Sequence, residues 1–195
     1  MQTPPAKSPS SPARPPSNSR FATTAFFVCL CLGVPLAILY FIFVGSMNES
    51  KKVTGLAGMK AAAASILMYS LDHNGYFPPA DRWMDAAQPF ANSEGAFHSP
   101  VASNGNKNVY GIAFRTDLGS KQMSPEQSAE PWAMVFDSTL MQRNAHSGLE
   151  TLPTPGRYRT KEGPSNIVAL VDGSAQAIPD DMRKESPLDG KPRIR

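Results

Sequence analysis

An uncharged apolar run, from Ala22 to Val44, is the feature that most constrains how this chain folds. About 20 consecutive apolar residues cross the hydrocarbon core of a bilayer as a helix, and a helix satisfies its own backbone polar groups there. Pro35 lies inside the run, where a membrane helix tolerates a proline as a kink. The run therefore predicts a transmembrane helix over residues 21–46.

The alternative interpretation of the run is a cleaved secretory signal, because Val44-Gly45-Ser46 offers small residues to a peptidase. The apolar core of such a signal is usually about 7–15 residues long, which is shorter than this run. We therefore favour a retained signal-anchor. Cys29 and Cys31 are the two cysteines of the chain and both lie within the run, so we expect no disulfide elsewhere.

The segments on either side of the run predict one domain on one anchor. Residues 1–20 are mostly Pro, Ser, Ala and Thr, which predicts a disordered tail. Residues 47–182 are long enough for one domain and contain no second apolar run, and residues 183–195 predict a flexible charged tail. Lysines and arginines are balanced across the run, so the positive-inside rule alone does not orient it.

A second helical stretch, over residues 53–71, follows the anchor and is amphipathic. Its apolar positions share one helical arc: Val53, Leu56, Met59, Ala63, Ile66, Leu67 and Leu71. Asn74-Gly75 and the prolines after it supply a stop. The anchor and this stretch therefore predict one long helix, half in lipid and half on a domain.

The rest of the chain predicts short elements. The expected strands are 109–114, 133–137, 167–171 and 174–178, and Asp172-Gly173 joins the last two as a hairpin. A short helix is expected at 82–88 with Asp81 as its cap, a loop at 92–108 and a helical turn at 124–127. The sequence thus predicts an α+β fold in which the long N-terminal helix packs on a small antiparallel sheet.

Charge argues against nucleic-acid binding. The net charge is only +3, and the densest basic cluster consists of Arg157, Arg159 and Lys161. That cluster is short and has no interleaved aromatic residue beyond Tyr158. We therefore expect no nucleic-acid partner.

The order of several motifs resembles one family. The helical stretch ends in Leu67 to Pro79, and then follow Phe97 to Pro100, Trp132 to Ser138 and Asn166 to Gly173. In this order they resemble the pseudopilin-like, type II secretion protein G-like family of bacteria, over roughly residues 59–178. The resemblance implies a pilin-like fold and a single-pass protein of the bacterial inner membrane with an extracytoplasmic domain. It also implies contacts with copies of itself, or with other pseudopilin-like subunits, through the N-terminal helix.

The chain departs from that family in places. Family precursors carry a Gly-Phe-Thr-Leu-Ile-Glu-like start, whereas this run offers Gly33-Val34-Pro35 and no acidic residue. One branch of that family has an Asp-Gly hairpin near its end, and this chain resembles that branch. Ser99-Pro100 stands where the branch has Cys-Pro, and Ser174-Ala175 stands where the branch has His-Val after the Asp-Gly turn. The resemblance therefore carries over neither a processing motif nor a metal or redox function.

Residue types that carry catalysis are scattered. The three histidines, His73, His98 and His146, lack the spacing of zinc ligands. Ser99 or Ser147 with His146 and Asp137 would suit a hydrolase, but neither serine lies in the glycine pattern of a nucleophile elbow. We therefore expect a protein that is not an enzyme.

Asp172, Asp180 and Asp181 are the acidic residues near the predicted hairpin. Carboxylate oxygens beside turn carbonyls are typical calcium ligands, so calcium is the one cofactor to consider. The loop lacks the alternating ligand spacing of a calcium-binding loop, which favours a solvated hairpin instead.

Together these features predict a membrane-anchored pseudopilin-like structural or assembly protein of a type II secretion or type IV pilus-like system. The alternative is a membrane-tethered extracytoplasmic binding module that does not assemble into filaments. A tethered hydrolase is a third class, and it requires His146 and Asp137 to converge on a serine or a metal.

Overall fold

The computed structural model describes residues 19–124 and 132–180, which divide between two compact units, one up to Val44 and one from Gly45 onwards. One helix, α1 (Ser19–Asp72), belongs to both units. The prediction of a long N-terminal helix is therefore confirmed. The tails predicted at 1–20 and 183–195 lie outside the described residues, apart from the two residues that begin α1. Most of the helical turn predicted at 124–127 also lies outside them.

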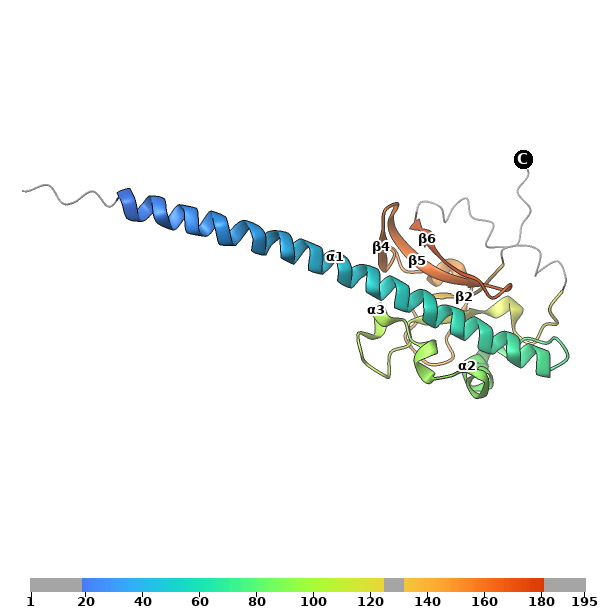
Figure 1. Ribbon diagram of the computed structural model, residues 1–195. Coiled ribbons are helices and arrows are strands. Elements are labelled where there is room, and N and C mark those ends of the chain that lie inside the picture. Colours follow the sequence, from blue (N-terminus) through green and yellow to red (C-terminus); the bar gives the residue numbers. More distant parts are fainter. Residues whose placement is uncertain (1–18, 125–131, 181–195) are drawn as a thin grey trace, which may run out of the picture. The chain divides into compact units, whose positions relative to one another are not determined.

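In the second unit, residues 45–72 of α1 pack against a sheet, with short helices on the other side of α1 (Figure 1). The buried positions of this stretch are Gly55, Met59, Ala62, Ala63, Ser65, Ile66 and Ser70. Two members of the predicted arc are exposed, Val53 at 61% and Leu71 at 82%. The predicted arc is wrong at these two positions because, at 100° per residue, Val53 and Leu71 both lie about 140° round the helix from Ile66, away from the covered face. Small residues on the covered face let the backbone approach closely.

The turn residues that follow α1 end the helix as predicted. The Gly75 amide donates to the Ser70 carbonyl at 2.8 Å, which satisfies one of the last free carbonyls of the helix. Asn74 and Gly75 both have positive φ, at 56° and 83°, and these two residue types tolerate that conformation best.

The sheet has six strands. They are β1 (Ile112–Arg115), β2 (Ala133–Asp137), β3 (His146–Ser147), β4 (Tyr158–Thr160), β5 (Gly163–Leu170) and β6 (Ala175–Pro179). Their order is β3-β1-β2-β5-β4, and β6 pairs with the other edge of β5. All pairs are antiparallel except β1 with β3, which is parallel. The α+β class is confirmed, while the expectation of a purely antiparallel sheet is wrong because of this one pair.

The predicted hairpin is present between β5 and β6. The two strands pair from Ser165 with Pro179 to Ala169 with Ala175. Gly173 has a φ of 82°, and the Ser174 amide donates to the Asp172 carboxylate at 2.8 Å. Turn chemistry of this kind explains the Asp-Gly pair fully.

Short helices fill the region between α1 and β1. The predicted helix at 82–88 is α2 (Trp83–Ala87), which starts without a side-chain cap from Asp81. The predicted loop at 92–108 is partly wrong, because it contains a 3-10 turn, Glu94–Phe97, and a short helix, α3 (Pro100–Ser103). Pro100 at the first position of α3 favours the helix there, since its fixed φ suits a helix start.

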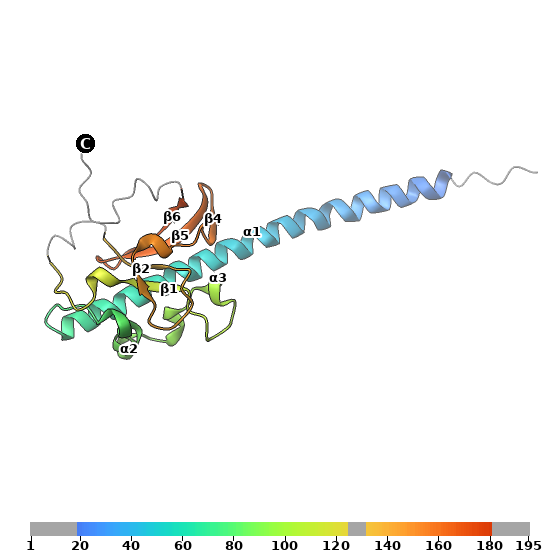
Figure 2. The ribbon, with the colours of Figure 1, turned by 180° about the vertical axis from the view of Figure 1, so that it is seen from behind.

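Two apolar clusters lie on the two faces of the sheet, and α1 covers the face of the larger one (Figure 2). The larger cluster joins α1 and α2 to the sheet and includes Ile66, Trp83, Phe114, Val135 and Ile167. The smaller cluster, on the opposite face, includes Phe136, Val168 and Leu152. Val135 and Phe136, consecutive on β2, belong to different clusters, as the alternation of side chains along a strand requires.

Candidate functional site

Residues 34–43 of α1 expose large apolar side chains on every side. The exposed fractions are 64% for Leu36, 54% for Ile38, 62% for Leu39, 66% for Tyr40, 75% for Phe41, 63% for Ile42 and 64% for Phe43. Consecutive residues of a helix are 100° apart, so the run from Ile38 to Phe43 covers the full circumference. We call residues 34–43 the exposed apolar segment.

Such a surface is abnormal for a helix in water, where an amphipathic helix exposes only its polar face. One helix among the described residues is long and apolar enough to cross a membrane, by length and composition. A bilayer would surround the segment with hydrocarbon on all sides, whereas a protein partner in water normally covers one face. The segment thus indicates a membrane anchor.

A groove lies in the second unit between α1 and the segment that carries α3. Its volume is about 460 Å³. Small residues line its α1 side, and His98 and Pro100 lie on the other. The lining residues are Thr54, Ala57, Gly58, Ala61, Ser93, Gly95, Ala96, His98, Pro100, Ser103 and Gly105. This volume lies within the about 300–1,000 Å³ usual for small-molecule sites, but the groove has no carboxylate among its lining side chains.

A buried ion pair joins β2 to the residue before β4. Asp137 is fully buried, and its Oδ1 lies 3.3 Å from Nη1 of Arg157. Its Oδ2 accepts the Ile167 amide hydrogen at 2.6 Å. The Arg157 guanidinium also donates to the carbonyls of Gly111 and Ser138. Both carboxylate oxygens of Asp137 and both terminal guanidinium nitrogens of Arg157 therefore have partners, as buried charges require.

Burial raises the pKa of the Asp137 carboxyl to about 6, although Arg157 and the Ile167 amide act in the opposite direction. Burial, together with the nearby Asp137 charge, also raises the pKa of the Tyr158 hydroxyl above its ordinary value. Tyr158 Oη lies 3.3 Å from Oγ of Ser99, which is only 2% exposed. A substrate has no access to a serine so deeply covered, so this cluster holds the fold together.

Of the residues of the hydrolase alternative, Ser99 hydrogen-bonds to Asp137, but the histidine does not join them. Asp137 is on β2 and His146 is on β3, and β1 lies between these two strands. Nδ1 of His146 lies 3.1 Å from the Asn144 carbonyl oxygen, and Oγ of Ser147 lies 2.6 Å from Oγ1 of Thr151. Adjacent strands are about 4.8 Å apart, so two strand spacings separate the acid from the histidine. The proposed combination of Ser99 or Ser147 with His146 and Asp137 is therefore not formed.

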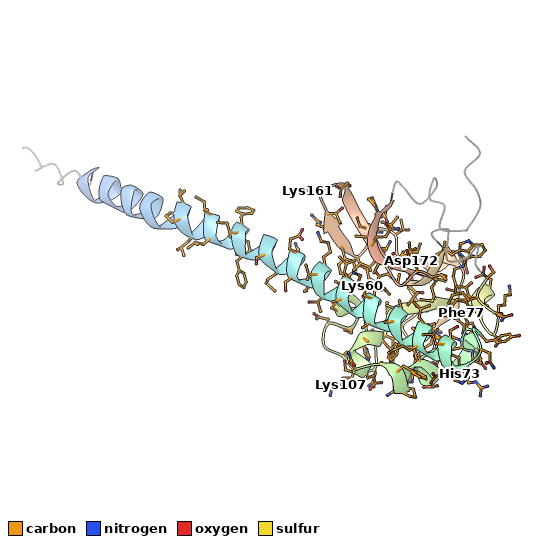
Figure 3. All side chains as sticks on the ribbon, turned by 45° about the vertical axis from the view of Figure 1, so that its right-hand side comes forward. Lys60, His73, Phe77, Lys107, Lys161 and Asp172 are labelled. Carbon is orange, nitrogen blue, oxygen red and sulfur yellow. The ribbon has the colours of Figure 1, made fainter. Side chains whose placement is uncertain are left out.

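The histidines also lie apart from one another, each with its own neighbours. His73 stacks on Tyr69 at 3.8 Å between ring centroids, and Figure 3 shows it at the end of α1. His98 stacks on Tyr110 at 4.3 Å and contacts the Val109 carbonyl through Nδ1 at 2.9 Å. Within residues 19–124 and 132–180, no group of three or more His, Cys, Asp or Glu side chains is placed to hold a metal ion.

The calcium candidates are separated along one strand. Asp172 lies in the turn before β6, where Figure 3 labels it, and Asp180 follows the end of β6. The Asp180 carboxylate accepts hydrogen bonds from the Gly156 amide at 2.8 Å and from Asn166 Nδ2 at 3.4 Å. Asp181 lies outside the described residues. Asp172 and Asp180 therefore do not share a site, because the length of β6 lies between them.

Arg143 organises a second polar network, which the sequence pattern did not indicate. Its guanidinium contacts Asp85 and Glu94, each at 2.7 Å, and the Tyr110 hydroxyl at 3.0 Å. Hydrogen bonds from Arg143 and Asn144 lower the pKa of Asp85. The network ties α2 and the Glu94–Phe97 turn to the segment before β3. Its members are far apart in the sequence and come from ordinary polar segments, so no local signal could have revealed it.

Comparisons with models of protein families, with curated proteins and with solved structures gave no match to this chain.

Proposed function

We propose that this protein is a membrane-anchored, pseudopilin-like structural or assembly subunit of a type II secretion or type IV pilus-like system. The observation that carries the proposal is the division of α1 into two chemically different parts. Its exposed apolar segment is uncovered on all sides, whereas Met59, Ala63 and Ile66 are buried against the domain. In a pilin-like protein, one long helix lies partly in the bilayer and partly against the folded domain.

The length of the apolar run supports the anchor. Residues 22–44 would extend about 35 Å at 1.5 Å per residue, and the hydrocarbon core is about 30 Å thick. We propose that the helix crosses the bacterial inner membrane once, with the tail inside and the domain outside. The order of motifs between residues 59 and 178 supports this orientation through its resemblance to extracytoplasmic pseudopilin domains.

Assembly would use the membrane helix. In lipid, helices associate through close van der Waals packing and interhelical hydrogen bonds, since lipid already surrounds apolar side chains. We therefore propose copies of this chain, or other pseudopilin-like subunits, as partners.

A second function is favoured by one specific observation, the groove of about 460 Å³ between α1 and the α3 segment. A monomer that holds a small molecule in this groove would be a membrane-tethered binding module. The absence of an acidic residue from the apolar run also favours this alternative, because the family's assembly glutamate has no counterpart here.

Oxidative crosslinking in native membranes tests the two functions against each other. Cys29 and Cys31 are the only cysteines, so each crosslink between chains reports helix-to-helix proximity. Assembly predicts a ladder of oligomers that reducing agent collapses. A matched variant, C29S/C31S, should give no ladder. A wild-type chain that remains monomeric at native abundance would contradict assembly and favour the tethered module.

A further inference from the structure

In the folded domain, Arg157 and Arg159 of the basic cluster lie beside α1. A Cβ atom added at Gly55 would lie 2.6 Å from the hydroxyl of Tyr158, so β4 lies directly against this turn of α1. Lys51, one helical turn earlier, and Arg159, on β4, line one pocket of about 150 Å³. We call it the Lys51–Arg159 pocket, and its lining residues are Asn48, Lys51, Val101, Arg157, Tyr158 and Arg159.

Neighbouring acidic groups already have other cationic partners. Glu49 pairs with Lys52 at 2.7 Å. The pKa of Glu162 is lowered by a hydrogen bond from its own backbone amide, by Thr160, and by the charges of Lys161 and Lys52. Figure 3 shows Lys161 at the tip of the hairpin that β4 and β5 form.

Three cationic side chains line the pocket, and one of them is paired with other groups of the protein whereas two are not. Arg157 is held by Asp137 and by two backbone carbonyls. The side chains of Lys51 and Arg159 make no hydrogen bond or ion pair with any residue that the structure describes, and both are exposed. The pocket therefore presents two uncompensated positive charges beside the amide of Asn48, which is a donor set suited to an oxyanion.

The size of the pocket and its position along α1 indicate which kind of anion it would bind. A pocket of about 150 Å³ is below the usual range of about 300–1,000 Å³ for whole small molecules, so it suits a single group such as a phosphate. Lys51 follows Val44, the last residue of the apolar run, by seven residues, or about 10 Å along a helix. The polar layer on each face of a bilayer is about 5–8 Å thick. Lys51 would therefore lie just beyond this layer, and a lysine side chain can extend back from there towards a phospholipid phosphate.

We propose that the Lys51–Arg159 pocket binds the phosphate of an anionic phospholipid headgroup. This inference rests on the proposed membrane anchor. Binding would fix the domain at the bilayer surface by the first turns of α1 beyond the lipid and by the strand β4 that packs on them.

The test is native mass spectrometry of the full-length chain in mild detergent, titrated with phosphatidylglycerol or phosphatidylcholine. The variant is K51Q/R159Q, and the matched control is K60Q/K107Q, which removes the same charge from two exposed lysines that do not line the pocket. Each basic group near an anionic surface contributes a few-fold in affinity, so we expect phosphatidylglycerol retention to fall roughly tenfold to thirtyfold in K51Q/R159Q. We expect the control to stay within about twofold of the wild type, and phosphatidylcholine to be retained less than phosphatidylglycerol throughout.

Other results would overturn the proposal. Equal retention by the wild type and K51Q/R159Q contradicts the pocket assignment. Release of the lipid by inorganic phosphate, with phosphate itself bound in a calorimetric titration, would make this a free-anion site and contradict the lipid assignment. Membrane fractionation separates these results from failure of the anchor, because a chain found only in the soluble fraction would refute the proposed function itself. Circular dichroism of the variants checks that their domains are folded.

Discussion

Arg157, the residue before β4, contacts several separate segments of the domain. Its guanidinium contacts Asp137 on β2 and the carbonyls of Gly111 and Ser138, and its amide donates to Asn166 on β5 at 3.4 Å. Removing one partner of a buried ion pair usually costs more than the pair contributes, because the other charge stays buried without compensation.

We expect R157Q to lower the free energy of unfolding by about 3 kcal/mol at pH 8. The loss should be roughly 1 kcal/mol smaller at pH 5. The pKa of Asp137 in the folded protein, about 6, lies above its ordinary value of 3.8. The folded state therefore holds this proton more tightly, and the penalty of the buried charge is complete above pH 6 and is relieved as the pH falls from 6 towards 3.8. Loss of Arg157 raises this pKa further, so the relief is larger in the variant.

Urea unfolding of the full chain in mild detergent, followed by the fluorescence of Trp83 and Trp132, measures both values. R82Q is the matched control, because Arg82 is exposed and should change stability by no more than about 0.5 kcal/mol. Asp85 and Asp117 have lowered pKa values and lose stability in acid, but they do so in both proteins and cancel in the comparison. A pH-independent loss would contradict the assigned ionisation of Asp137.

Single residues differ in how far the sequence could place them. Trp83 and Phe136 are fully buried, as the hydrophobicity of large aromatic side chains alone favours. The Asp137–Arg157 pair could not be predicted, because its partners are 20 positions apart and meet only when β2 and β4 lie along the same edge of β5. The same holds for Lys51 and Arg159, whose meeting depends on the packing of α1 on β4.

Among the elements, α1 contains two glycines in its domain-packed part, Gly55 and Gly58, that have opposite surroundings. At Gly55 an added Cβ would lie 2.6 Å from Tyr158 Oη and 2.7 Å from Ile167 Cδ1, so the helix needs glycine there to approach the sheet. At Gly58 the nearest atom to an added Cβ is the Ala96 carbonyl oxygen at 3.8 Å, which is an ordinary contact. Alanine substitutions at these two glycines therefore distinguish the effect of close packing from the effect of helix propensity.

We expect G55A to destabilise the domain by about 1–2 kcal/mol, because overpacking displaces the buried Tyr158 ring. G58A should instead stabilise it by about 0.5–1 kcal/mol, since alanine is the better helix former and meets no obstacle. The same urea experiment reports both. Equal shifts of the same sign in the two variants would refute the packing of β4 against this turn of α1.

Element prediction succeeded where the local signal was strong. The strand at 133–137 matches β2, and the Asp-Gly hairpin is where the turn residues indicated. β3 and β4 are two and three residues long and partly polar, so they have too few residues to show alternation. β5 begins at Gly163, before the predicted start at 167, because its first residues pair with β4. The parallel pairing of β3 with β1 depends on the path of the chain between residues 138 and 145, which local sequence does not specify.

At the scale of the whole molecule, the apolar run was the strongest predictor. Its length and lack of charge predicted a helix that needs a bilayer, and residues 34–43 expose their apolar side chains on every side. The partner of that helix was not predictable, because apolar character alone does not identify the helix against which it packs. The Lys51–Arg159 pocket and the groove beside α3 depend likewise on tertiary packing.

The measurement that tests the account most directly is alkaline carbonate extraction of membranes from cells that express the full chain, with the intact mass of the product. A retained anchor predicts that the protein stays in the membrane pellet and that its mass includes residues 22–44. A chain that is released into the supernatant, and whose intact mass shows that it starts near Gly45 or Ser46, would identify a cleaved signal and contradict the anchor.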